Sequence, residues 1–193
     1  MKTDIILAGV GGQGILSIAA IIGEAAIEKG LSLKQSETHG MSQRGGAVVS
    51  HLRISDLPIA SDLIPAAGAD VILSVEPMES LRYLPWLSNE GWLVTNSTPF
   101  LNIPDYPDIQ PIREEINKIP HSVWVDADDI ARKLGNPRGS NMVMLGAAAP
   151  FLQLTDTEIE KAIGIIFSRK GQEVIHANIL AYRAGKEISA KLI

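Results

Sequence analysis

The stretch that decides the fold is Met1–Gly14, which reads MKTDIILAGVGGQG. The apolar run at residues 5–8 predicts a short buried strand. Three glycines follow at G-x-G-x-x-G spacing, with a fourth between them: Gly9, Gly11, Gly12 and Gly14. Apolar residues then recur at helical spacing over residues 15–26. A strand, a glycine turn and a helix in this order predict the first unit of an α/β fold.

The glycine turn, together with Gln13, is a candidate binding site. Glycines let a ligand approach the backbone closely, and the start of a helix offers unpaired N–H groups to an anion. We therefore predict a nucleotide or another phosphate-bearing ligand at this turn. The alternative is that the glycines only let the first helix pack tightly on the first strand.

Composition sets limits on the class of protein. The chain has 193 residues, for which one α/β domain over residues 1–193 is expected. Hydrophobic residues make up 46% and glycine adds 17 positions, so the apolar fraction exceeds the roughly 45–50% of average domains. Charged residues make up 20%, below the usual value of about 25%. This apolar excess predicts a large subunit interface.

Charge and residue usage exclude several functions. The net charge of −5 leaves no basic footprint for nucleic acid. The chain has no cysteine, which excludes disulfides and iron–sulfur clusters held by its own thiolates. Neither a signal peptide nor an apolar run long enough for a membrane span is present, so we expect a cytoplasmic protein without membrane contact.

The rest of the chain alternates strands and helices. Further strands are predicted at 31–36, 47–55, 70–75, 91–96 and 122–125, with a hairpin strand at 59–61. Helices are predicted at 77–84, 126–134, 142–152, 155–166 and 172–188. Residues 99–120 are rich in proline and predict a surface excursion with helical turns at 112–118. The order indicates an open, mainly parallel, Rossmann-like sheet with helices on both faces, and C-terminal helices over 155–193 that pack on it.

The least ordinary segment is Glu37–Gly46, ETHGMSQRGG, which we predict to be a loop between two strands. Arg44 could bind a phosphate or carboxylate, while the backbone of Gly45 and Gly46 approaches the same anion beside Gln43. His39 could be a ligand, an acid or base, or a turn residue. A functional loop and a merely polar connection both remain open.

Acidic and amide side chains stand at the ends of predicted strands. A dinucleotide site requires an acidic residue at the end of the second strand, and Glu37 is a loose match because it lies 23 residues after Gly14. Glu76 and Asn96 end two later strands. Strand ends in a parallel sheet meet at one edge, so these residues are expected to line one crevice. The alternative for Glu76 is a carboxylate near a helix start.

Four motifs together resemble a known family. They are the glycine turn GVGGQG at 9–14, the loop ETHGMSQRGG at 37–46, SHLR at 50–53 and NMVMLG at 141–146. They resemble the gamma-type subunit of 2-oxoacid:ferredoxin oxidoreductases. The loop is most similar to that of the indolepyruvate-type members, in which this chain corresponds to the beta subunit.

The resemblance implies a reaction and a division of labour. An aryl 2-oxoacid such as indolepyruvate is oxidatively decarboxylated with coenzyme A, which gives an aryl acyl-CoA, carbon dioxide and reduced ferredoxin. Thiamine diphosphate, magnesium and iron–sulfur clusters belong to a large alpha subunit, and no cofactor is held by this chain alone. The glycine turn and residues 43–46 are implied to meet coenzyme A. An independent NAD- or FAD-dependent oxidoreductase and a purely structural assembly subunit remain alternatives.

Overall fold

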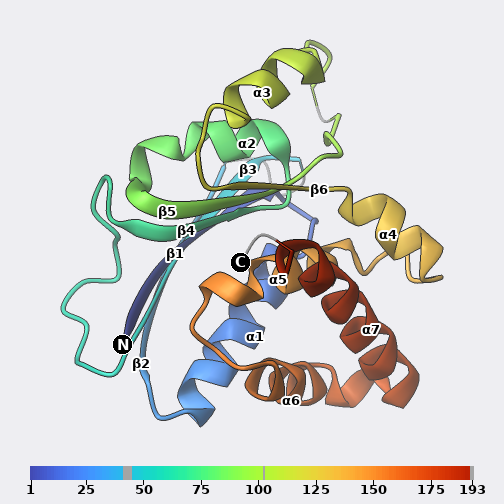
Figure 1. Cartoon of the computed structure of the whole chain (residues 1–193). Coiled ribbons are helices and arrows are strands. Elements are labelled where there is room, and N and C mark those ends of the chain that lie inside the picture. Colours follow the sequence, from blue (N-terminus) through green and yellow to red (C-terminus); the bar gives the residue numbers. More distant parts are fainter. Residues whose placement is uncertain (41–44, 102, 192–193) are drawn as a thin grey trace.

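A computed structural model describes residues 1–40, 45–101 and 103–191 of the chain (Figure 1). Its single sheet has the strand order β2-β3-β1-β4-β5-β6. The strands are β1 Lys2–Val10, β2 Ser32–His39, β3 Ala47–Ser55, β4 Ala69–Ser74, β5 Leu87–Asn96 and β6 Ser122–Val125. Strands β1, β4, β5 and β6 pair in parallel, whereas β3 runs antiparallel between β1 and β2. The prediction of a mainly parallel α/β sheet is confirmed.

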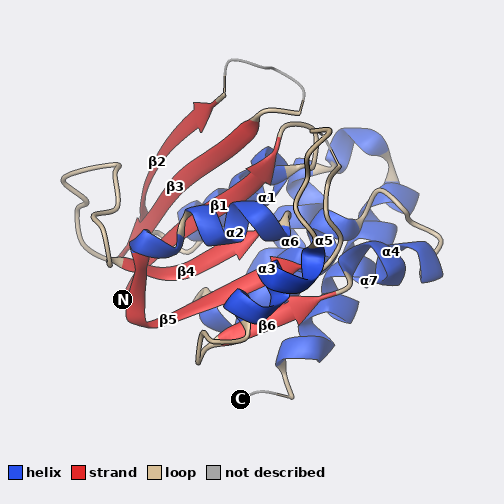
Figure 2. Cartoon of the chain, turned by 90° about the horizontal axis from the view of Figure 1, so that it is seen from above, coloured by secondary structure: helices blue, strands red, loops and turns tan. Residues whose placement is uncertain are grey.

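Helices cover both faces of the sheet, as Figures 1 and 2 show. One face carries α2 Pro77–Arg82 and α3 Ile109–Ile116. The other carries α1 Ile15–Glu28, α4 Ala127–Lys133, α5 Ser140–Ala148, α6 Asp156–Ile166 and α7 Gln172–Ser189. Short 3-10 turns occupy Leu84–Trp86, Ala149–Phe151 and Ser168–Lys170. No helix in the described part of the chain is both long and apolar enough to span a bilayer.

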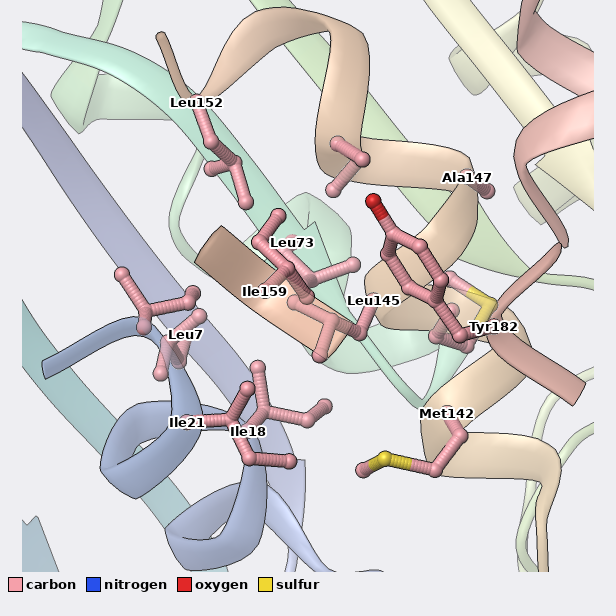
Figure 3. Packing of buried hydrophobic residues seen from close by; sticks show 14 of the residues in the cluster. Leu7, Ile18, Ile21, Leu73, Met142, Leu145, Ala147, Leu152, Ile159 and Tyr182 are labelled. Atoms are coloured by element: carbon pink, nitrogen blue, oxygen red, sulfur yellow. The ribbon is translucent and has the colours of Figure 1, made fainter. Parts of the chain in front are cut away.

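The sheet separates two hydrophobic cores. Successive residues of β1 point to opposite faces, so Leu7 joins the core under α1 and α5, while Ile6 joins the core under α2 and α3. Figure 3 shows Leu7 with Ile18 of α1 and Leu145 of α5 in the larger core. Burial on both faces explains why β1 and β4 read as continuous apolar runs.

Helices α5 and α7 touch at the level of their backbones. A Cβ added to Gly146 would lie 1.8 Å from the carbonyl oxygen of Tyr182, and one added to Gly185 would lie 1.9 Å from that of Val143. The two glycines are therefore reciprocal, since each admits the backbone of the other helix. Residues 142–148 are all buried, so this almost wholly apolar helix is enclosed on every side.

At the amino edge of the sheet, the motif residue Arg53 has a structural partner. Its guanidinium donates from Nε to Asp4 Oδ1 at 2.7 Å and from Nη2 to Asp4 Oδ2 at 2.9 Å. Its Nη1 also donates to the carbonyls of Ser61 and Leu63. The Asp4 side chain is only 1% exposed, so this bidentate ion pair compensates a buried carboxylate and holds the 61–63 loop on the sheet.

Several predicted boundaries were wrong. Strand β2 continues to His39, so Glu37 and His39 are strand residues and not loop residues. Pairing with β3 provides backbone partners through this polar segment and overrides its weak strand propensity. No strand forms at 59–61 within the described chain, because Arg53 holds this segment through carbonyls instead. The helix predicted over 142–152 ends at Ala148, where a 3-10 turn containing Pro150 follows.

Candidate functional site

The carboxyl edge of the sheet brings the predicted residues together. Strands β1, β2, β4 and β5 all end there, at Val10, His39, Ser74 and Asn96. The glycine turn connects β1 to α1 at this edge, and Glu76 lies two residues after the end of β4. The expected meeting of strand ends is therefore observed, although Glu37, Glu76 and Asn96 do not line the pocket beside the glycine turn.

Two glycines of the turn are required by their backbone conformation. Gly12 has φ 102° and Gly14, the N-cap of α1, has φ 83° and ψ 22°. Both lie in the left-handed region, which disfavours residues with a Cβ. A Cβ on Gly14 would also lie 2.4 Å from Asn141 Nδ2, which donates to the Gly14 carbonyl at 3.3 Å. The start of α5 therefore packs directly against the start of α1.

Gln13 stabilises the turn from within. Its Oε1 accepts a hydrogen bond from the Val10 N–H at 2.8 Å, and its Nε2 donates to the Val75 carbonyl at 3.2 Å. Gly9 adjoins the same place, since a Cβ there would lie 2.4 Å from Val75 Cγ2. The Gln13 side chain thus joins the end of β1 to the end of β4.

Asn96 and Glu76 are held by similar protein contacts. Asn96 Nδ2 donates to the Val75 carbonyl at 3.3 Å and to Asp128 Oδ2 at 2.8 Å, while Oδ1 accepts from the Ala127 N–H. Glu76 is fully buried, and its Oε2 accepts from the Glu79 N–H at 2.8 Å as the N-cap of α2. Both side chains therefore already have hydrogen-bond partners from the protein.

The second oxygen of Glu76 fixes the proline-rich segment. Its Oε1 accepts hydrogen bonds from the Phe100 N–H and from the Tyr106 hydroxyl. Burial, followed by this hydrogen bond to the carboxylate, raises the pKa of Tyr106 above its ordinary value. The buried carboxylate thus ties Phe100 and Tyr106 to the carboxyl edge.

An open pocket of about 310 Å³ lies beside the glycine turn. Its lining comes from the turn, the first residues of α1, and strands β2 and β3: Val10, Gly11, Gly12, Gly14, Ile15, Leu16, His39 and Val48. Within the described chain, the N–H groups of Gly12, Gly14 and Ile15 donate to no protein acceptor. Unpaired amides at a helix start, next to apolar side chains, suit a ligand with an anionic group and an apolar body.

Glu37 and His39 lie two residues apart on β2, so their side chains share one face of the strand. The His39 Nε2 and Glu37 Oε1 atoms form an ion pair when the imidazole is protonated. His39 is exposed and lines the pocket, whereas the Glu37 side chain is only 13% exposed. The Glu37 carboxylate therefore has a neighbour within the protein and is not simply open to a ribose.

The segment after β2 returns to the glycine turn. The Gly11 N–H donates to the Gly46 carbonyl at 2.9 Å, and the Gly40 N–H donates to the Ala47 carbonyl at 2.8 Å. Gly45 has φ 77°, which explains the glycine there. Gln43 and Arg44 lie outside the described residues, so their predicted contact with an anion stays a prediction.

Sequence reasoning missed four residues of the pocket: Val10 and Ile15, which adjoin glycines of the turn, and Leu16 and Val48. Leu16 is one of the apolar residues that recur at helical spacing over 15–26, but it is 56% exposed and forms one wall. Val48 of β3 forms another because β3 is inserted between β1 and β2. The signal for Leu16 is its position directly after the glycine turn, where a helix start faces a ligand.

Comparisons with known proteins agree with one another. The family model "Pyruvate ferredoxin/flavodoxin oxidoreductase" matches residues 4–188. Indolepyruvate oxidoreductase subunit IorB of Methanothermobacter thermautotrophicus is 38% identical over 96% of this chain and 96% of its own length. The same subunit of Archaeoglobus fulgidus is 34% identical over 96% of this chain and 94% of its own length.

Solved structures share the fold. The pyruvate oxidoreductase subunit PORC from Thermotoga maritima is 27% identical, with a TM-score of 0.72 over 97% of this chain and 96% of that one. A 2-oxoglutarate:ferredoxin oxidoreductase from Magnetococcus marinus, described with 2-oxoglutarate, coenzyme A and succinyl-CoA bound, has a TM-score of 0.79 at 22% identity. That match covers 100% of this chain but 32% of the longer neighbour, and at this identity it supports the fold alone.

Proposed function

Because the chain belongs to the pyruvate ferredoxin/flavodoxin oxidoreductase family, we propose that it is the accessory subunit of an indolepyruvate-type 2-oxoacid:ferredoxin oxidoreductase. The resemblance to gamma-type subunits is confirmed, and the chain is a subunit of a 2-oxoacid:ferredoxin oxidoreductase. The observation that carries the choice of indolepyruvate is the identity of 34% and 38% to two IorB subunits over nearly their whole length.

The proposed reaction is the oxidative decarboxylation of an aryl 2-oxoacid. The bond between the carboxylate and the oxo carbon breaks, carbon dioxide leaves, and the acyl carbon forms a thioester with coenzyme A. Two electrons pass to ferredoxin. Thiamine diphosphate, magnesium and iron–sulfur clusters are assigned to a large alpha subunit, which agrees with the lack of cysteine thiolates in this chain.

In this proposal the chain holds coenzyme A and carries out no bond-breaking step. The amides of Gly12, Gly14 and Ile15 bind the anionic diphosphate, and Leu16 and Val48 contact the apolar parts of the coenzyme. Gln13 keeps these amides in place by joining the ends of β1 and β4. The site is pre-organised, because its supporting side chains already have their hydrogen bonds in the free protein.

The experiment tests both the reaction and the pocket. The chain is co-expressed with a cysteine-rich, thiamine-dependent partner, and ferredoxin reduction is measured with indolepyruvate and coenzyme A. Leu16→Glu places a carboxylate beside the proposed diphosphate, so we expect the KM for coenzyme A to rise about tenfold. Ile27→Glu is the matched control, since Ile27 is 59% exposed on the same helix and lies outside the pocket.

Two results contradict the proposal. Absence of indolepyruvate-dependent ferredoxin reduction in a complex that assembles contradicts the reaction. Equal KM values for coenzyme A in the Leu16→Glu and Ile27→Glu complexes contradict the pocket. Tight binding of NAD or FAD by the chain alone supports the independent oxidoreductase instead. A cytoplasmic location, without nucleic acid or membrane partners, is part of the proposal.

A further inference from the structure

A second pocket, of about 340 Å³, lies next to the first turn of α1. Its polar lining comes from five segments of the chain: Ser17, Asn136, Arg138, Asn141, Lys170 and Asn178. Residues 14–16 line the glycine-turn pocket and Ser17 lines this one, so the two pockets are neighbours along α1. Asn141 connects them, because its Nδ2 donates to the Gly14 carbonyl. Hereafter this is the Arg138 pocket.

The charge of the Arg138 pocket is opposite to that of the protein. Two cationic residues and no acidic residue line it, although the whole chain carries a net charge of −5. Elsewhere most cations pair with a carboxylate, as Lys29 does with Glu158 and Arg183 does with Glu160. Within the described chain, Arg138 makes neither an ion pair nor a hydrogen bond. An unbalanced positive charge in a concave site favours an anionic ligand.

The other cation and the amides of this pocket are partly pre-positioned. Lys170 Nζ lies 5.1 Å from the centroid of the Phe167 ring, which holds the ammonium near the pocket without neutralising it. Asn178 is only 8% exposed, and its Nδ2 donates to the Val174 carbonyl one turn earlier in α7. The pocket therefore combines two exposed cations, Arg138 and Lys170, with the amide side chains of Asn141 and Asn178, which are held by hydrogen bonds to backbone carbonyls.

We propose that the Arg138 pocket is a subsite for a phosphate monoester. Arg138 would bind the phosphate bidentately and Lys170 would add a point charge. This inference rests on the proposed function for the identity of the coenzyme. Coenzyme A carries a diphosphate and, separately, a 3′-phosphate on its ribose, which matches two neighbouring anion sites. NAD and FAD carry only the diphosphate.

The test compares two fragments of the coenzyme on the full chain. Binding of adenosine 3′,5′-bisphosphate and adenosine 5′-monophosphate is measured by calorimetry for the wild type, Arg138→Gln and Lys170→Gln. We expect the wild type to prefer the bisphosphate about tenfold, and each variant to lose most of this preference while its affinity for the monophosphate is unchanged. Arg169→Gln is the matched control, because Arg169 adjoins Lys170 but does not line the pocket.

Three outcomes overturn the subsite: equal affinity of the wild type for both nucleotides, a preference that survives in Arg138→Gln, or an equal loss in Arg169→Gln. Inorganic phosphate is titrated as well, and binding of free phosphate with no preference for the bisphosphate overturns the coenzyme assignment. In the assembled enzyme we expect Arg138→Gln to raise the KM for coenzyme A with an unchanged kcat. A complex that fails to oxidise indolepyruvate contradicts the proposed function, but leaves this binding measurement intact.

Discussion

The contact between α5 and α7 makes a quantitative prediction about stability. In Gly146→Ala the new methyl group would lie 1.8 Å from the Tyr182 carbonyl oxygen, whereas a carbon and a carbonyl oxygen in contact are roughly 3.3 Å apart. The helices must therefore separate locally by about 1.5 Å. Even a gap of about 1 Å removes up to half of the dispersion energy of each atomic contact between α5 and α7.

We expect Gly146→Ala to lower the free energy of unfolding by about 3 kcal/mol, because backbone atoms cannot move aside as a side chain would. In urea unfolding, with a slope of about 2 kcal/mol per molar, the midpoint should fall by about 1.5 M. Gly185→Ala should cost a similar amount, since its methyl group would lie 1.9 Å from the Val143 carbonyl oxygen. The double variant should lose less free energy of unfolding than the two single variants together, because both substitutions separate the same pair of helices.

Gly164→Ala is the matched control within α6. No atom lies within 4 Å of the added Cβ, so only helix propensity changes and the protein should gain about 1 kcal/mol. Midpoints for Gly146→Ala and Gly185→Ala that lie as high as that of Gly164→Ala would refute the backbone contact. If the losses of unfolding free energy were additive in the double variant, the inference that both glycines lie in one contact between α5 and α7 would be refuted.

Three further perturbations test contacts described above. Arg53→Met leaves the buried Asp4 carboxylate with the exposed Lys2 ammonium as its remaining ion-pair partner, so the free energy of unfolding should fall by about 2–3 kcal/mol in urea titrations, with partial recovery when Asp4→Asn is added. Tyr106→Phe removes a donor to the buried Glu76 carboxylate and should cost about 2 kcal/mol, with faster hydrogen exchange at residues 100–106; unchanged exchange would contradict this anchor. Burial lowers the pKa of His51 below 6.5, so the unfolded chain binds its proton first and stability should fall as pH drops below about 6.5; a His51→Gln variant with the same pH profile would contradict this.

Local signals in the sequence were sufficient for much of the fold. The β6 strand lies at Ser122–Val125, where a short strand was predicted. The helix predicted at 155–166 begins with a capping box, in which the Thr155 side chain accepts from the Glu158 N–H and the Glu158 side chain accepts from the Thr155 N–H. Pro77 opens α2 after Glu76, its N-cap. In each case the interacting residues are neighbours in the chain, so a short window contains the whole interaction.

The candidate site could be predicted only in part. Spacing identified the glycine turn and the strand ends, but not the contacts of their side chains. Gln13 and Asn96 both donate to the Val75 carbonyl, so two residues predicted to meet a ligand also join neighbouring strands, which their spacing did not show. The pocket itself lies toward β2, because β3 is inserted beside β1 and brings Val48 to its wall.

By itself, then, the sequence determined the α/β class, the glycine turn and the family, because each depends on residue types at fixed short spacings. The tertiary structure alone decided that Gly146 faces Gly185's helix and that Arg138 and Lys170 line one pocket. Each of these pairs is separated by more than thirty positions. Whether such residues meet depends on helix packing over the whole sheet, where the burial of many side chains outweighs any local preference.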